Sequence, residues 1–124
     1  MKTLEDIEKL INSELTSKIN NSKINHGQIY LNIDESNVLD VILFLKINKN
    51  TSFKQLIDIT AVDYPENDKR FMLVYLLLSH ENNQRIIISF YLNEYEIPTS
   101  LTSIFPSANW MEREVFDMYG IEFK

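Results

Sequence analysis

The chain has 124 residues and a mass of 14.6 kDa, which suits one compact domain and is too short for two ordinary ones. Its 12 Lys and Arg against 18 Asp and Glu give a formal charge of −6, which argues against non-specific binding of nucleic acid, because that binding needs cations to neutralise phosphates. The absence of cysteine excludes disulfides, thiolate metal sites and cysteine nucleophiles. The two glycines are too few and too far apart for a phosphate-binding loop.

The first half of the chain predicts two helices and one strand. Apolar residues recur at steps of three and four from Leu4 to Leu15, after a capping-box pattern at Thr3 and Asp6, and this predicts a helix. Residues 29–33 alternate between apolar and polar, which is typical of a half-buried strand. A second helix is predicted from a cap at Ser36 to Ile47.

The second half predicts three strands and a final helix. Residues 56–62 form one strand, and residues 70–79 and 85–92 form an antiparallel hairpin. The last helix begins after a cap at Ser107 and stops at Gly120. The order α-β-α-β-β-β-α predicts a single α+β domain over residues 1–124, with two layers, an antiparallel or mixed sheet and the helices mainly on one face.

The run Phe71–Leu78 is apolar at every position, so both of its faces favour leaving water. Either the strand is central in a well-covered domain, or another protein covers the second face. The run is eight residues long, well under the roughly 20 that span a bilayer, and the N-terminus has no apolar signal-peptide core. We therefore expect a soluble domain that faces the cytosol.

The final helix is the densest candidate for a functional surface. At about 100° per residue, one face gathers apolar residues, which we expect to pack on the sheet. These residues are Met111, Val115, Met118 and Tyr119. The opposite face carries Trp110, Arg113, Glu114 and Asp117. An exposed Trp beside an Arg is typical of a partner surface, and a merely solvated charged face is the alternative.

Glu112 falls on the apolar flank of this helix, so we expect it to need a basic partner, with Arg70 and Arg85 as the candidates. A catalytic acid–base pair of Glu112 and Glu114 is disfavoured, because residues two apart on a helix point about 200° away from each other. The lone histidines His26 and His80 are typical of turn and hairpin-end positions. No catalytic, cofactor-binding or metal-binding residue is predicted.

Three segments carry a resemblance to a known family. Residues 56–65 contain an Asp-x-x-x-x-Asp-Tyr-Pro stretch, residues 70–79 follow it, and residues 106–121 contain a Glu-Arg-Glu-x-x-Asp core. Together they resemble the thirty-kilodalton subunit family of respiratory complex I, the NADH–quinone oxidoreductase. The resemblance covers about residues 53 to 123, and the N-terminal part agrees in layout only.

The resemblance implies a scaffold and assembly subunit in the peripheral arm, without flavin, iron–sulfur cluster or quinone pocket of its own. Its implied partners are the large quinone-site subunit and other peripheral-arm subunits, with no nucleic acid and with the membrane only through the complex. The implied place is the cytoplasmic face of the bacterial inner membrane. The resemblance also implies that the enzyme is the assembled complex, which oxidises NADH, reduces a quinone and translocates protons, and that this chain has no active site of its own.

Two other functions stay open. The same domain resembles components of membrane-bound hydrogenases and formate hydrogenlyases, where it again supports a large subunit. A stand-alone acidic binding module is the third interpretation. In the thirty-kilodalton family the segment that contains the Glu-Arg-Glu-x-x-Asp core continues to a His or Lys and then an Arg, followed by a tail along neighbouring subunits. This chain ends at Lys124 instead, and we interpret it either as a trimmed fragment or as a natural short form.

Overall fold

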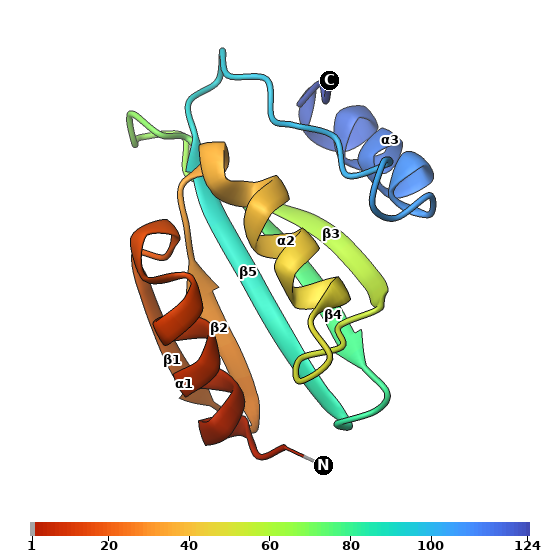
Figure 1. The fold of residues 1–124 in the computed structure, drawn as a ribbon. Helices are drawn as coiled ribbons and strands as arrows, with labels where there is room; N and C mark the ends of the chain where they lie inside the picture. Colours follow the sequence, from red (N-terminus) through yellow and green to blue (C-terminus); the bar gives the residue numbers. More distant parts are fainter. Residues whose placement is uncertain (1) are drawn as a thin grey trace.

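The computed structural model describes residues 2–124 as one layer of helices on one layer of sheet (Figure 1). The α-helices are α1 (Leu4–Glu14), α2 (Val38–Ile47) and α3 (Ala108–Tyr119). The strands are β1 (Asn21–Asn25), β2 (Gln28–Asn32), β3 (Gln55–Asp63), β4 (Phe71–Ser79) and β5 (Gln84–Leu92). Two short 3₁₀ turns, Thr16–Lys18 and Glu35–Asn37, lie between them.

The sheet is mixed, with the strand order β1-β2-β5-β4-β3. β2 and β5 are parallel, and the other neighbouring pairs are antiparallel. The α+β class is therefore confirmed, but the element order is α-β-β-α-β-β-β-α, one strand more than the predicted α-β-α-β-β-β-α. The missing strand is β1, whose sequence Asn-Ser-Lys-Ile-Asn has one apolar residue. An edge strand that is exposed along most of its length needs no apolar alternation, so the sequence carries no signal for it.

Several of the predicted boundaries have visible local causes. Thr3 and Asp6 form the predicted capping box at the start of α1. α3 ends where Gly120 adopts φ 74°, a left-handed conformation that glycine enters without steric cost. The side chains of the two serines predicted as caps do not cap their helices. Ser36 lies inside a 3₁₀ turn, and Ser107 has helical dihedrals and makes no capping hydrogen bond.

The core lies between the helices and one face of the sheet. Alternate residues of the two central strands point into it and are buried: Phe71, Leu73, Tyr75 and Leu77 from β4, with Ile86, Ile88, Phe90 and Leu92 from β5. The buried positions of α1 and α2 meet them from the other layer. This pattern is the alternation of a strand with one covered face.

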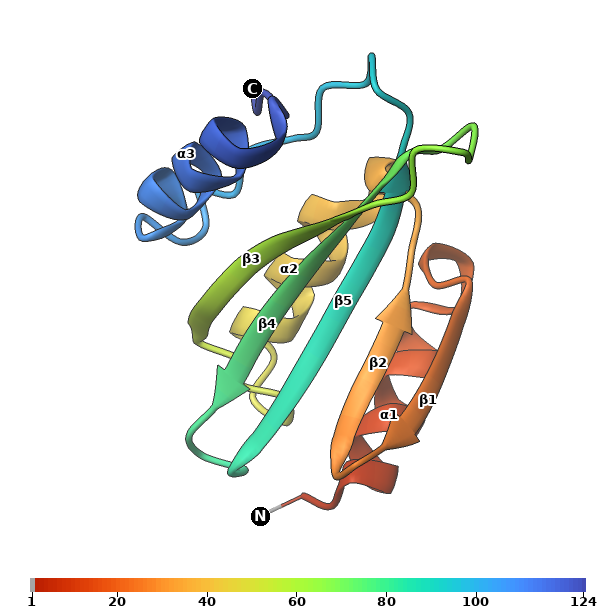
Figure 2. The ribbon, with the colours of Figure 1, turned by 180° about the vertical axis from the view of Figure 1, so that it is seen from behind.

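The second face of the sheet has no helix in front of it, as Figure 2 shows from behind. The intervening residues of β4 and β5 point to this side and are half-buried or exposed. We call this side the open face. The apolar run of β4 therefore contributes hydrophobic side chains both to a face that helices cover and to a face that no helix of residues 2–124 covers.

Candidate partner interface on helix α3

α3 lies on the helix side of the sheet, next to the edge strand β3 (Figures 1 and 2). Met111 and Val115 are buried against the domain, as the helical pattern predicts. The ring of Tyr119 meets the ring of Phe71 edge-on, with centroids 6.3 Å apart. This geometry is a favourable one for aromatic pairs. The inner face of α3 is thus fixed to β3 and β4.

Glu112 is buried, at 6% exposure, and its carboxylate is held by neutral donors. The Ser100 hydroxyl donates to Oε1 at 2.7 Å, and the Leu101 N–H donates to Oε2 at 2.8 Å. The expectation of a basic partner was wrong. Arg70 pairs with Asp63 and Glu94 instead, and Arg85 lies on the open face. The connection before α3 brings its own hydroxyl and amide to the carboxylate, so no cation is required there.

The segment that receives Glu112 is itself anchored to the rest of the domain. The Thr99 N–H donates to Glu35 Oε2 at 2.9 Å, and Lys46 Nζ donates to the Ile104 carbonyl at 2.6 Å. The C-terminal residue runs alongside it, since the Ser100 N–H donates to the Lys124 carbonyl at 2.7 Å. Glu112 therefore links α3 to a segment that is tied to α2 and to the end of the chain.

The hydroxyl of Tyr75 lies buried on this side of the sheet without a hydrogen-bond partner within residues 2–124. Burial raises the pKa of Tyr75 well above its usual range, and the nearby carboxylates of Glu112 and Glu35 raise it further. Arg70, directly before β4, donates hydrogen bonds to Asp63 at the end of β3. These bonds lower the pKa of Asp63, because they stabilise the charged carboxylate. Tyr75 is buried in the core, and the Asp63–Arg70 ion pair joins the end of β3 to the start of β4.

The predicted outer residues of α3 are exposed: Trp110, Arg113, Glu114 and Asp117. Trp110 is 57% exposed, and the Arg113 side chain makes no hydrogen bond or ion pair within the described residues 2–124. Met118, predicted to face the sheet, is 74% exposed, so that prediction was wrong. β3, against which α3 packs, is an edge strand, so no further strand lies beyond it to cover Met118.

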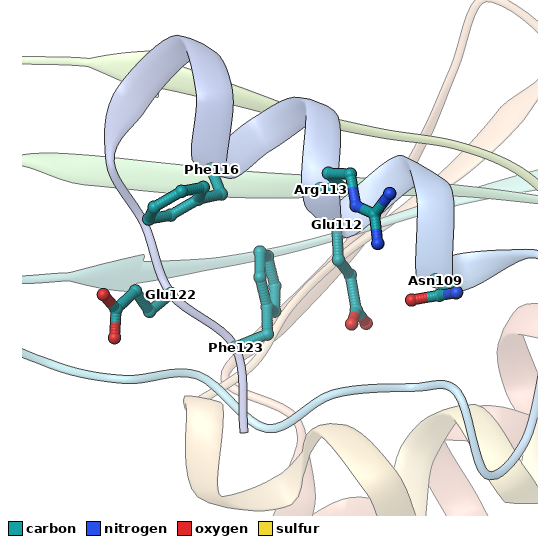
Figure 3. Close-up of a pocket in the computed structure, with 6 residues that line it drawn as sticks. All are labelled: Asn109, Glu112, Arg113, Phe116, Glu122 and Phe123. Atoms are coloured by element: carbon teal, nitrogen blue, oxygen red, sulfur yellow. The ribbon is translucent and has the colours of Figure 1, made fainter.

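A hollow of about 340 Å³ lies along α3, on the side facing the C-terminal residues (Figure 3). It is lined by Asn109, Glu112, Arg113, Phe116, Glu122 and Phe123. Phe116, at 45% exposure, and Phe123 supply apolar walls, while the Arg113 guanidinium stands beside them. Such a hollow can take an apolar side chain of a partner next to a group that pairs with Arg113.

Sequence reasoning missed the part of this hollow that helical periodicity does not reach. Phe123 lies beyond the end of α3, and only the return of the chain past Gly120 brings it opposite Phe116. Asn109 had no pattern to mark it. Phe116 was visible as an apolar residue outside the predicted inner face, which is the one signal that could have found it.

Glu112 and Glu114, the two glutamates of the Glu-Arg-Glu-x-x-Asp core, lie in different surroundings. Glu112 is buried and bound to the preceding segment, whereas Glu114 points to solvent. Over residues 2–124, no three His, Asp or Glu side chains are grouped closely enough to hold a metal ion. None of the helices in this same range has the length and apolar character needed to cross a membrane.

Comparison with known proteins gives this surface a family context. Residues 31–124 match the family described as "Respiratory-chain NADH dehydrogenase, 30 Kd subunit". An NADH-quinone oxidoreductase subunit from Ruegeria sp. (strain TM1040) is 40% identical over 99% of this chain and 61% of its own length. The subunit of the same name from Wolbachia sp. subsp. Brugia malayi (strain TRS) is 50% identical over 77% of this chain and 49% of its own length.

Among solved structures, a chain of the membrane-bound sulfane sulfur reductase, an archaeal respiratory membrane complex, has the same fold. The TM-score is 0.84 at 23% identity, over 97% of this chain and 69% of that one. This chain spans about 60% of the length of the Ruegeria sp. (strain TM1040) relative. The chain belongs to the family of the 30 kDa subunit of respiratory-chain NADH dehydrogenase.

Proposed function

We propose that the chain is a non-catalytic scaffold and assembly subunit in the peripheral arm of an NADH:quinone oxidoreductase. In this role it packs against the large quinone-site subunit and supports electron transfer from NADH to quinone without carrying electrons itself. Its place is the cytoplasmic face of the bacterial inner membrane, and it reaches the membrane only through the complex. Family membership supports this proposal.

One observation carries the proposal to particular residues. Two adjacent residues of the Glu-Arg-Glu-x-x-Asp core have opposite environments. Glu112 is buried and hydrogen-bonded to the preceding segment, whereas Arg113 is exposed and makes no ion pair within residues 2–124. Large side chains that a domain would otherwise bury stand on the same helix, namely Trp110, Phe116 and Met118. Exposed aromatics, Met and Arg are the residues enriched at the centres of protein interfaces.

We further propose that the chain holds no redox cofactor of its own. The sequence has no cysteine to ligate an iron–sulfur cluster and no glycine-rich loop for a dinucleotide phosphate. The assembled complex then supplies the electron carriers, and this chain supplies surface. A stoichiometric visible or EPR-active centre in the purified full chain would contradict this part of the proposal.

The test is Arg113→Ala in cells that depend on this chain, with Lys9→Ala on the exposed side of α1 as the matched control. If a desolvated partner carboxylate loses its arginine, association should weaken by about 2–5 kcal/mol. The free energy of unfolding of the chain should change by no more than about 0.5 kcal/mol, because the substitution is exposed. The readouts are the amount of chain recovered in assembled complex and the NADH–quinone activity of membranes.

Arg113→Lys should recover only part of the loss, because an ammonium cannot make the two parallel bonds of a guanidinium. Normal assembly and activity of Arg113→Ala would contradict the placement of the interface on α3. Identifying the proteins that co-purify with the wild-type chain also separates this proposal from the alternative of a hydrogenase or formate hydrogenlyase subunit. A monomer with no large partner would instead indicate a stand-alone binding module.

A further inference from the structure

The open face of the sheet is a second surface that no helix covers. The middle of the open face is a mainly apolar strip of Met72, Val74, Leu76 and Leu78 of β4 with Ile87 and Tyr91 of β5, between which lies the polar Ser89. Its residues are half-buried between neighbouring side chains, except Tyr91, which is 42% exposed. Figure 2 shows that no helix stands before these two strands on this side.

The strip ends in a hollow of about 340 Å³ at the turn between β4 and β5. Leu78 forms part of its wall, and the lining includes the Arg85 guanidinium and the imidazoles of His26 and His80. Its other lining residues are Gly27, Gln28 and Asn83, so no carboxylate lines it. We call it the basic hollow. The chain as a whole has a formal charge of −6, whereas this hollow is lined by an arginine and by no acidic residue.

The charge of Arg85 in the basic hollow is not neutralised by an acid of residues 2–124. The nearby Glu81 is engaged by Lys54, with Nζ 2.8 Å from Oε1. His80 Nε2 lies 2.6 Å from the Gln55 side-chain oxygen, which is neutral. The Arg85 guanidinium makes no hydrogen bond or ion pair within residues 2–124. A guanidinium in this situation can bind a carboxylate through two parallel hydrogen bonds.

We propose that the open face is a second docking surface, which binds a segment of a different protein. That segment lays apolar side chains on the strip and places an Asp or Glu carboxylate in the basic hollow against Arg85. This inference rests on the proposed function as an assembly subunit. A second copy of the chain fits less well. Two copies each carry a formal charge of −6, and this charge opposes their association.

The test uses the full chain in cells, with the photo-crosslinking amino acid benzoylphenylalanine in place of one tyrosine at a time. Tyr91 on the open face is the probe position, and Tyr95, 84% exposed in the connection after β5, is the matched control. We expect Tyr91, and not Tyr95, to crosslink to an apolar segment of another subunit that contains an acidic residue. Crosslinks to a second copy, or no more crosslinking than at Tyr95, would overturn the proposal.

The charge pairing is then tested in the same complex. We expect Arg85→Glu to lower the recovery of assembled complex about tenfold, and replacement of the crosslinked segment's acid by Lys to restore it in the double variant. Failure of that exchange to restore assembly would overturn the pairing. If Arg113→Ala disrupts assembly while Arg85→Glu does not, the proposed function stands and this inference falls. If neither variant affects assembly, both fall.

Discussion

The two faces of β4 differ in cover although they hardly differ in hydrophobicity. Phe71, Leu73, Tyr75 and Leu77 lie under helices and are buried, whereas Met72, Val74, Leu76 and Leu78 lie on the open face and are half-buried. The same division recurs on α3, where Glu112 is buried and its neighbour Arg113 is exposed. An apolar strand therefore indicates which side chains avoid water, but not whether its own domain or another protein covers them.

The sharpest test of this division compares two adjacent leucines. Leu77→Ala removes a fully buried side chain, so the free energy of unfolding of the free chain should fall by about 2–5 kcal/mol. Leu76→Ala, half-buried on the open face, should cost about 1 kcal/mol or less. Urea denaturation followed by circular dichroism measures both. Equal losses would show that the free chain already covers its open face.

The same comparison can be made within α3. Glu112→Ala leaves the buried Leu101 N–H without its acceptor, so the free energy of unfolding should fall by about 1–3 kcal/mol. Glu112→Gln should cost less, because an amide oxygen can still accept that N–H while its nitrogen donates to the Ser100 hydroxyl. Thermal and urea unfolding check the order. A Glu112→Gln chain as unstable as Glu112→Ala would mean that the negative charge itself is required.

A smaller effect is expected at Tyr75, whose hydroxyl is buried without a partner within residues 2–124. Tyr75→Phe should leave the free energy of unfolding unchanged or raise it by about 1 kcal/mol, since an unsatisfied polar group is removed. Because the folded pKa of Tyr75 is raised, its hydroxyl stays protonated where the unfolded chain ionises, above about pH 10. The contribution of the Tyr75 hydroxyl to the free energy of unfolding is therefore complete below about pH 10 and falls above it.

The Tyr75→Phe chain should therefore lose less stability than the wild type between neutral pH and the range above about pH 10. Urea unfolding at both pH values gives the difference directly. A loss of stability in Tyr75→Phe at neutral pH would indicate that the hydroxyl has a partner, such as a buried water, and that the covered face of β4 tolerates polar groups better than the comparison implies.

Much of the fold was predictable because local physics determines it. The capping box at Thr3 and the left-handed stop at Gly120 are encoded by the residues themselves. β1 was not predictable, since pairing with β2 and not apolar alternation makes it a strand. The exposure of Met118 was not predictable either, because it depends on β3 being the edge of the sheet, a property of topology.

The candidate interface was predictable in part for the same reason. Helical periodicity separates the exposed Arg113 from the buried Val115, and it places Trp110 outside. It could not name the partner of Glu112, because the Ser100 hydroxyl comes from a segment without regular structure. Nor could it bring Phe123 to the hollow beside α3, which requires the chain to turn back after the helix.

Hydroxyl-radical footprinting of the free chain and of the complex purified from membranes tests whether this chain acts through the surface that its own fold leaves exposed on α3. Trp110 and Phe116 on α3 are the reporters, and the highly exposed Tyr95 is the internal reference. We expect both reporters to oxidise readily in the free chain and to be protected in the complex, while Tyr95 keeps its reactivity. Equal oxidation of Trp110 and Phe116 in the two states would contradict it.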